Sequence, residues 1–120
     1  MGAAERTMRA ALTDPLSALG VVWLIEAPDA RDLLSLRAAR VLAEADTLVL
    51  GDGVAADVAV LARRDAPRRT LADTGAAFLI AEAKAGRQTA VVAGRGALTD
   101  LALAIGGAAV HHMLAPAPSA

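Results

Sequence analysis

The sequence predicts an α/β fold in which three layers, αβα, enclose a mostly parallel sheet of about five strands. Short apolar runs alternate along the chain with longer stretches whose apolar residues have helical spacing, and this alternation is typical of parallel sheets. The runs VVWLI at 21–25 and TAVVA at 89–93 contain no charged residue, which suits strands that helices cover on both faces. Right-handed crossovers then place the strand-to-helix loops on one rim of the sheet.

Composition limits the class of protein further. A chain of 120 residues suits one domain with one core, and that core must be aliphatic because Trp23 and Phe78 are the only aromatic side chains. The formal net charge of −1 gives no general attraction to nucleic acid or to an anionic membrane. No apolar run approaches the roughly 20 residues of a membrane-spanning helix. The charge and the short apolar runs therefore predict no nucleic-acid or membrane partner. Cysteine is absent, which fits a reducing compartment, so we expect a cytoplasmic protein.

Three segments are expected along the chain. Residues 1–19 form an N-terminal extension in which 3–12 can be helical, because Thr13-Asp14-Pro15 would end such a helix. Residues 20–114 form the α/β domain. Residues 115–120 are a small, proline-rich tail that we expect to be flexible.

The first strand, loop and helix offer two interpretations of the same acidic residues. The apolar strand 21–25 is followed by a loop from Glu26 to Arg31 and by a helix that ends near Ala45. Asp29 with Asp32 three residues later resembles a capping box at the start of this helix. A carboxylate beyond the end of a parallel strand can equally serve a binding site. Both roles stay open for Asp29, whereas capping is the simpler role for Asp32.

The remaining elements follow the same alternation, with glycines expected in the turns. Asp73 or Thr74 is expected to cap the helix that ends at Gly86. The expected strands and helices are, in order, strand 47–50, turn Gly51–Gly53, helix 54–64, strand 69–71, helix to Gly86, strand 89–93, turn Gly94–Gly96, helix 98–105 and strand 108–114.

Several other motifs have simpler structural explanations than chemical ones. His111 and His112 are adjacent on an expected strand and point to opposite faces, so they are poorly placed to bind one metal ion. The arginines of 63–69 surround Pro67 and are expected to form a solvated helix end and turn. Gly94-Arg95-Gly96 could bind an anion before a helix, although a plain turn explains it as well. Asp29 and Asp52, near two strand ends, could suggest a phosphorylation site like that of a receiver domain. Such a site would need a lysine after a strand, but Lys84 lies inside an expected helix, so this interpretation is not favoured.

Four stretches, taken in order and spacing, resemble the tetrapyrrole methylases, the S-adenosylmethionine-dependent methyltransferases of sirohaem and cobalamin synthesis. The similarity covers about residues 20–116, which would correspond to the N-terminal subdomain of this family, and the uroporphyrinogen-III C-methyltransferase branch is the most similar. The stretches are VVWLIEAPDARDLLSLRAARVLAEADTLVLGD, VLARRDA, AEAKAGRQTAVV and LALAIGGAAVHHMLAP.

The loops of this chain depart from the family pattern, although its strands and helices follow it. Residues 26–30 replace a glycine-rich GAGPGD-type loop, and Gly51 replaces a tyrosine before Asp52. The family's longer loop between residues 71 and 76 is missing, and its GGDP loop is contracted to residues 94–97. The family's second domain, which supplies half of the methyl-donor cleft, has no counterpart in residues 1–120.

The resemblance therefore implies a methyltransferase-like half domain that is inactive alone, with no catalytic residue, no metal site and no cofactor for the chain by itself. If the family activity is retained, S-adenosylmethionine is the implied cofactor. One alternative is a part of a uroporphyrin-III C-methyltransferase completed by a second chain or domain, and another is a small-ligand or assembly module. The implied partner is a second copy, forming a dimer, or a second methylase half. By family position the implied substrate-binding residues are Pro28, Asp29 and Asp52, and the cofactor-binding residues are Gly94, Arg95 and Gly96.

Overall fold

The structure is a computed structural model that describes residues 20–28, 34–54 and 56–115. Its centre is a five-stranded sheet with the order β4-β3-β5-β2-β6, in which every neighbouring pair is parallel. The predicted α/β class and parallel sheet are confirmed. The predicted extension at 1–19 and residues 116–120 of the predicted tail lie outside the described residues. The strands are β2 (Val22–Glu26), β3 (Thr47–Leu50), β4 (Arg68–Thr70), β5 (Thr89–Ala93) and β6 (His111–Leu114).

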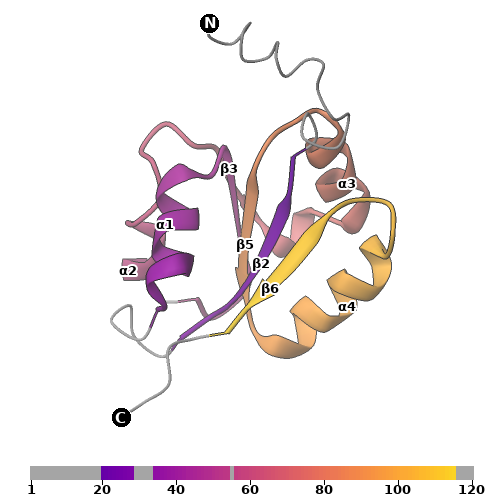
Figure 1. Ribbon diagram of the computed structural model, residues 1–120. Helices are drawn as coiled ribbons and strands as arrows, with labels where there is room; N and C mark the ends of the chain where they lie inside the picture. The colour runs from indigo at the N-terminus through magenta and orange to yellow at the C-terminus, as the bar shows by residue number, and fades with distance from the viewer. Residues whose placement is uncertain (1–19, 29–33, 55, 116–120) are drawn as a thin grey trace, which may run out of the picture.

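Helices cover both faces of the sheet (Figure 1). The helices are α1 (Leu36–Glu44), α2 (Ala56–Ala59), α3 (Ala76–Lys84) and α4 (Arg95–Ile105), with a short 3-10 helix, η3 (Leu71–Asp73), after β4. Buried residues of α1 and α2 belong to one core cluster, and buried residues of α3 and α4 belong to the other. The chain therefore forms the three layers αβα.

The direction of each crossover explains which face each helix covers. The connections from β2 to β3 and from β3 to β4 move toward the β4 edge, and they carry α1 and α2. The connections from β4 to β5 and from β5 to β6 move the opposite way, and they carry α3 and α4. Because right-handed crossovers that move in opposite directions must use opposite faces, two helices lie on each side of the sheet.

The two core clusters are aliphatic, as the composition requires. Alternate residues of β2 point to opposite faces, so Val22 and Leu24 pack toward α3 and α4 while Ile25 packs toward α1. All five residues of β5 are buried, which its apolar run predicts. Trp23, only partly buried, donates its indole N–H to Gln88 Oε1 at 3.0 Å.

Several predicted boundaries and caps are wrong. Helix α1 starts at Leu36, and its N-cap is Ser35, whose hydroxyl oxygen accepts the Ala38 N–H at 3.0 Å. Asp29 and Asp32, the predicted capping pair, lie outside the described residues. Helix α3 starts after Gly75 without a side-chain cap, so neither Asp73 nor Thr74 has the predicted capping role.

Helices α2 and α4 differ in length from the prediction. Helix α2 has only four residues, and the carbonyl groups of Ala59, Arg63 and Ala66 accept hydrogen bonds from the guanidinium of Arg68. These carbonyl groups are therefore satisfied without further helical turns. Residues 95 and 96 are the first turn of α4, not the predicted turn before it.

The amino ends of the strands are held by a partly buried polar cluster. Thr47 donates its hydroxyl to Glu82 Oε1 at 2.9 Å, and Arg87 donates to Glu82 Oε2 at 2.8 Å. Arg87 is fixed near Glu82 because its backbone N–H also bonds the Glu82 carbonyl, in the turn that ends α3. Gly86 permits this turn with a φ of +87°.

Candidate functional site

A cavity of about 300 Å³ opens at the carboxyl ends of β3 and β5. After β3 the chain turns toward the α1–α2 face, and after β5 it turns toward the α3–α4 face. Neighbouring strands whose connections leave in opposite directions create a crevice, which is the usual ligand position in open α/β sheets. The lining residues are Gly51, Asp52, Leu71, Ala72, Ala93, Gly94 and Ala97.

Close packing of β3 against β5 shapes the floor of this cavity. The Gly51 N–H bonds the Val92 carbonyl at 2.8 Å, and a Cβ atom at Gly51 would lie 2.9 Å from the Ala93 Cβ. Such a distance is not tolerated without movement, so glycine is required here by the approach of Ala93. The tyrosine that the family resemblance places at this position does not fit the present backbone arrangement.

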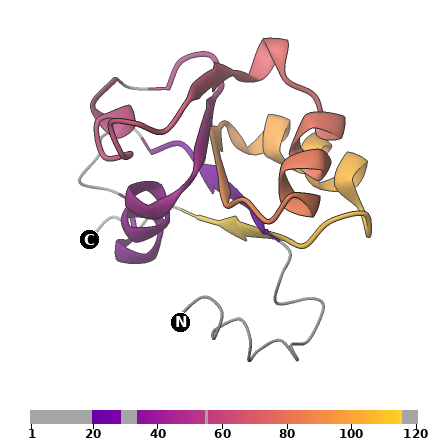
Figure 2. The same cartoon turned by 90° about the horizontal axis from the view of Figure 1, so that it is seen from above.

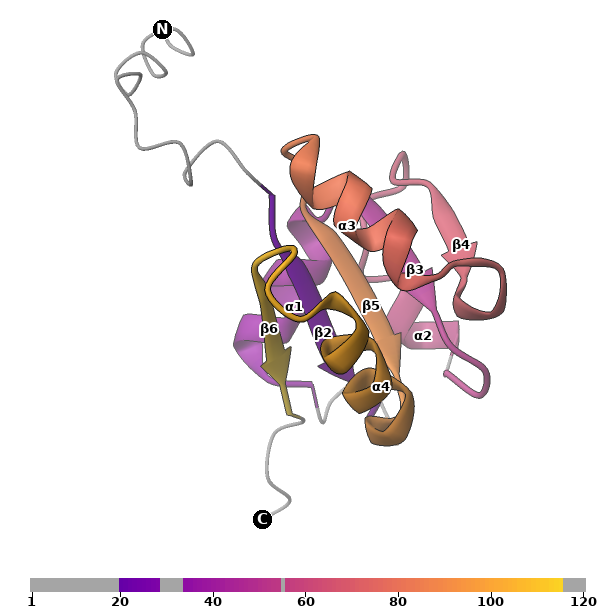
Figure 3. The ribbon, with the colours of Figure 1, turned by 90° about the vertical axis from the view of Figure 1, so that its right-hand side faces the viewer.

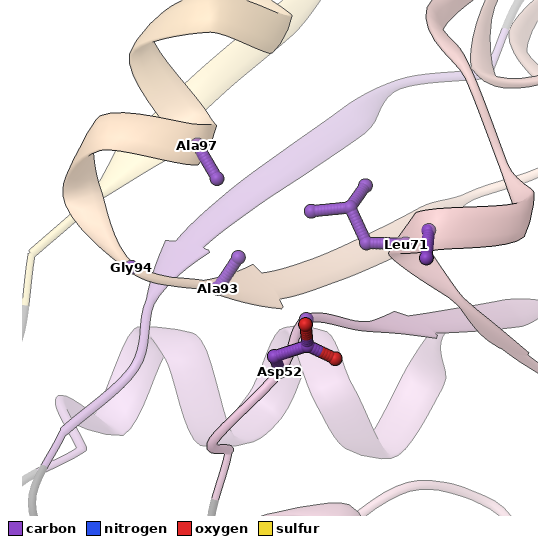
Figure 4. Close-up of a pocket in the computed structure, with 7 residues that line it drawn as sticks. Asp52, Leu71, Ala93, Gly94 and Ala97 are labelled. Atoms are coloured by element: carbon purple, nitrogen blue, oxygen red, sulfur yellow. The ribbon is translucent and has the colours of Figure 1, made fainter.

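Asp52 is the one charged side chain among the lining residues. It is exposed, and Figure 4 shows it at the end of β3, while Leu71 and Ala97 extend toward the same space from η3 and α4. The cavity therefore has apolar walls and a single carboxylate at an open rim.

Of the three predicted cofactor-binding residues, the structure places only one at the cavity. Gly94 lines the cavity and is the N-cap residue of α4. Arg95 is not a lining residue, because its guanidinium turns to Glu26 at the end of β2, with Nη2 at 3.3 Å from Oε1. This ion pair is exposed on the arginine side, where 76% of the side chain is accessible. Gly96 lies in the first helical turn and lines no part of the cavity.

The predicted substrate-binding residues are also separated. Asp52 lines the cavity, whereas Pro28 is buried and is not among the lining residues. Asp29 lies outside the described residues. Sequence reasoning missed Leu71, Ala72, Ala93 and Ala97, which carry no chemical signature and line the cavity only because β4 and β5 flank β3.

The other motifs retain structural roles in the described part of the chain. His112 packs against Trp23, with ring centroids 5.1 Å apart, and no described group of three or more His, Cys, Asp or Glu residues could hold a metal ion. Arg69 stacks on Phe78 at 4.2 Å, and Arg63 forms ion pairs with Asp46 and Asp65. The side chains of these arginines are thus engaged within the domain.

Comparison with known proteins gives matches at the level of structure. No family model and no curated protein matches the sequence. Uroporphyrin-III C-methyltransferase from Thermus thermophilus matches with a TM-score of 0.70 and 27% identity over 83% of this chain. The chain has a tetrapyrrole methylase fold. Cobalt precorrin-4 methyltransferase, a cobalamin biosynthetic enzyme, matches with a TM-score of 0.66 and 13% identity over 88% of this chain.

The matches bear out the family resemblance of the sequence at the level of fold. This chain spans about half the length of each methyltransferase, because 49% of each of those chains is covered. Within the described residues, no helix is long and apolar enough to cross a membrane.

Proposed function

We propose that this chain is a tetrapyrrole methyltransferase-like half domain that does not transfer methyl groups by itself. The observation that carries this proposal is the coverage of the matches, since 83% of this chain corresponds to 49% of the Thermus thermophilus methyltransferase. A site shared between two halves of such an enzyme would be incomplete in either half alone.

The cavity at β3 and β5 supports this proposal. Small-molecule sites usually bury 70–90% of the ligand surface and place several polar groups around it. Here Asp52 and Gly94 are exposed, and Asp52 is the single charged side chain of a cavity of about 300 Å³. A ligand in this cavity would keep much of its surface in water, so affinity from the half domain alone would be low.

The cofactor implied by the family, S-adenosylmethionine, fits these residues only in part. The Asp52 carboxylate could accept hydrogen bonds from the ribose hydroxyls, and the walls of Leu71 and Ala97 could contact an apolar surface. The cofactor's own carboxylate would find no cationic side chain among the lining residues, because Arg95 is paired with Glu26. No step of methyl transfer follows from this arrangement.

A second candidate function is a half enzyme that a second chain or domain completes. The exposed carboxylate of Asp52 favours it, because an acceptor group at an open rim is available to a ligand shared with a second chain. The partner, the cytoplasmic location and a small-ligand or assembly role remain predictions of the sequence.

Calorimetric titration with S-adenosylhomocysteine tests these functions. We expect no binding of the isolated chain below a Kd of about 1 mM, and no label transfer from methyl-labelled S-adenosylmethionine to uroporphyrinogen III. Two results would contradict the proposal that the chain is inactive by itself. One is micromolar binding of S-adenosylhomocysteine that Asp52→Ala abolishes, and the other is label transfer by the isolated chain. Co-expression with the remaining half of the Thermus thermophilus enzyme addresses the second function, which predicts binding in the mixture only.

A further inference from the structure

One flank of α4 and the neighbouring strand β6 expose apolar side chains to solvent. Leu103 of α4 is 77% exposed, and Met113 of β6 is 48% exposed. Met113 is paired in register with Leu24, whose side chain packs in the α3–α4 core cluster, so Met113 faces the same side of the sheet as α4. Residues 101–114 contain no Asp, Glu, Lys or Arg. Leu103 and Met113 therefore define an apolar surface, which we call the α4–β6 surface.

Leu103 points away from the cavity at β3 and β5, toward the β6 edge of the sheet. Ala97 of α4 lines that cavity, and six residues at about 100° each place Leu103 about 120° away from Ala97 around the helix axis. Figures 2 and 3 show α3 and α4 on one face of the sheet and α1 on the other. Because β6 is the edge strand, no described strand lies beyond it. The α4–β6 surface thus has room for one more element beside α4.

The chain enters the domain next to this surface. The Val22 N–H bonds the carbonyl of Val110, just before β6, at 3.0 Å. Gly20 packs so closely on the Arg87 backbone that a Cβ atom would overlap the Arg87 carbonyl, so glycine is required to hold the chain here. Figure 1 shows the start of β2 and the loop from α4 to β6 at the same end of the sheet. Residues 1–19 are therefore attached to the domain beside the end of α4.

The sequence before Gly20 has the pattern of an amphipathic helix. Within residues 3–12, apolar positions recur every three or four residues, and the charged positions lie outside that stripe. An isolated helix of about ten residues is marginal in water, so such a segment needs an apolar surface to pack on. The apolar positions are Ala4, Met8, Ala11 and Leu12, and the charged positions are Glu5, Arg6 and Arg9.

We propose that residues 3–12 dock as a helix on the α4–β6 surface of the same chain, with the apolar stripe on Leu103 and Met113. The connection is long enough, because residues 13–19 span up to about 24 Å when extended. Five residues, 106–110, suffice to join the end of α4 to the start of β6, the strand beside β2. The segment enters from the amino ends of the strands, where α4 also ends, so the docked helix runs parallel to α4.

Covalent attachment explains why the occupant is this segment. A short flexible linker holds a segment at an effective concentration of about 1 mM. An apolar contact with a Kd of about 0.1 mM for the separate segment then keeps about nine-tenths of the chains docked. The absence of charged residues from 101–114 suits this contact, because the apolar stripe meets no group that must stay hydrated, while the charged positions of the segment remain in solvent.

Hydrogen exchange followed by mass spectrometry tests the docking in the full chain. We expect the amides of residues 3–12 to exchange about tenfold more slowly than in a free peptide of the same sequence. Leu103→Asp places a carboxylate in the apolar contact and should return these amides to the peptide rate. Val60→Asp is the matched control and should keep the protection, because Val60 is 69% exposed and follows α2 on the opposite face. Thermal melting checks that both variants fold.

Cysteine cross-linking tests which surface the segment contacts, because the sequence contains no cysteine. At about 1 μM protein, a short bismaleimide should link Met8→Cys to Met113→Cys within one chain at least tenfold faster than Met8→Cys to Leu36→Cys. Leu36 is the matched control, because it is 89% exposed and lies on α1, on the opposite face.

Four results would overturn the proposal. They are unprotected amides at residues 3–12 of the wild type, protection that Leu103→Asp leaves intact, equal linking of the two cysteine pairs, and links that form only between two chains.

Discussion

Replacing Glu82 with Gln tests how the amino ends of the strands are held. The Glu82 side chain is 10% exposed, and it accepts hydrogen bonds from Thr47 at 2.9 Å and from Arg87 at 2.8 Å. The substitution keeps the shape and one acceptor oxygen for the Thr47 hydroxyl, but it removes the charge that pairs with Arg87. The amide nitrogen that takes the place of Oε2 is a donor, so the substitution removes the hydrogen bond from Arg87 together with the charge.

The expected loss in the free energy of unfolding at pH 7 is about 1.5 kcal/mol. Hydrogen bonds to a charged group contribute about 1.5–3 kcal/mol and exposed ion pairs about 0.2–1 kcal/mol. The pair lies between these limits, because Arg87 is 50% exposed while Glu82 is nearly buried. For a domain of this size, 1.5 kcal/mol corresponds to a decrease in Tm of about 5 °C.

The loss depends on pH in a defined direction. The hydrogen bond from Arg87, opposed by burial and supported by Thr47, lowers the pKa of Glu82 below its ordinary value of 4.5. A carboxyl group with a lowered folded-state pKa stabilises the fold above the unfolded pKa, and that contribution is lost as the pH falls through the folded pKa. Because glutamine does not titrate, the gap between wild type and Glu82→Gln is full at pH 7 and closes below pH 4.5.

Urea unfolding followed by circular dichroism from pH 3 to pH 8 measures this gap. Asp65→Asn is the control, since Asp65 forms an ion pair with Arg63 while 80% exposed, and it should change stability by less than about 0.5 kcal/mol. A gap for Glu82→Gln that is the same at pH 3 as at pH 7 would refute the assignment of the loss to the ion pair.

Three further substitutions test the site and the helix start. Gly51→Ala should cost about 1–3 kcal/mol of stability because of its contact with Ala93, and Ala93→Gly in the same chain should restore most of it in thermal melts. Ser35→Ala should cost about 1 kcal/mol by loss of the N-cap, and an unchanged urea midpoint would argue against that cap. Arg95→Ala should change stability by less than about 0.5 kcal/mol, because its ion pair with Glu26 is exposed; a larger loss would show that the pair holds the rim together.

Local apolar patterns predicted the strands and the layers well. Strand β5 was predicted with its observed bounds because every residue from Thr89 to Ala93 is buried, so the apolar run and the element coincide. The length of α2 could not be predicted in this way. Its spacing of apolar residues continues to Leu61, but the guanidinium of Arg68, which lies beyond the predicted end of the helix, binds the carbonyl groups of Ala59 and Arg63.

The helix starts were ambiguous because the sequence offers several residues of suitable type. Asp29 and Ser35 are both residue types that cap helices, and the N-cap of α1 in the structure is Ser35. Gly94 and Gly96 both suggest a turn, yet Gly94 is the N-cap of α4 and Gly96 is helical. Glycine has no side chain whose periodicity could distinguish these two states.

The candidate site was predicted in part, for a similar reason. Asp52 and Gly94 were placed on one rim by the handedness of crossovers, and both line the cavity. The contribution of Leu71 and Ala72 depends on β4 lying beside β3, with β5 on the other side of β3. Strand order is a long-range property, and the local pattern of residues 68–72 contains no information about it.

The position of β2 between β5 and β6 has a consequence for how the chain reaches its native state. Val22 pairs with Thr89 on one side and with His111 on the other, so both of its strand neighbours emerge from the ribosome long after it does. Contacts between segments so distant in sequence slow folding, because a long loop must close before they form. The apolar segment 22–25 therefore stays without strand partners until residues 89–93 have been synthesised. Substitutions that delay β5 should promote aggregation of nascent chains more than their effect on equilibrium stability predicts.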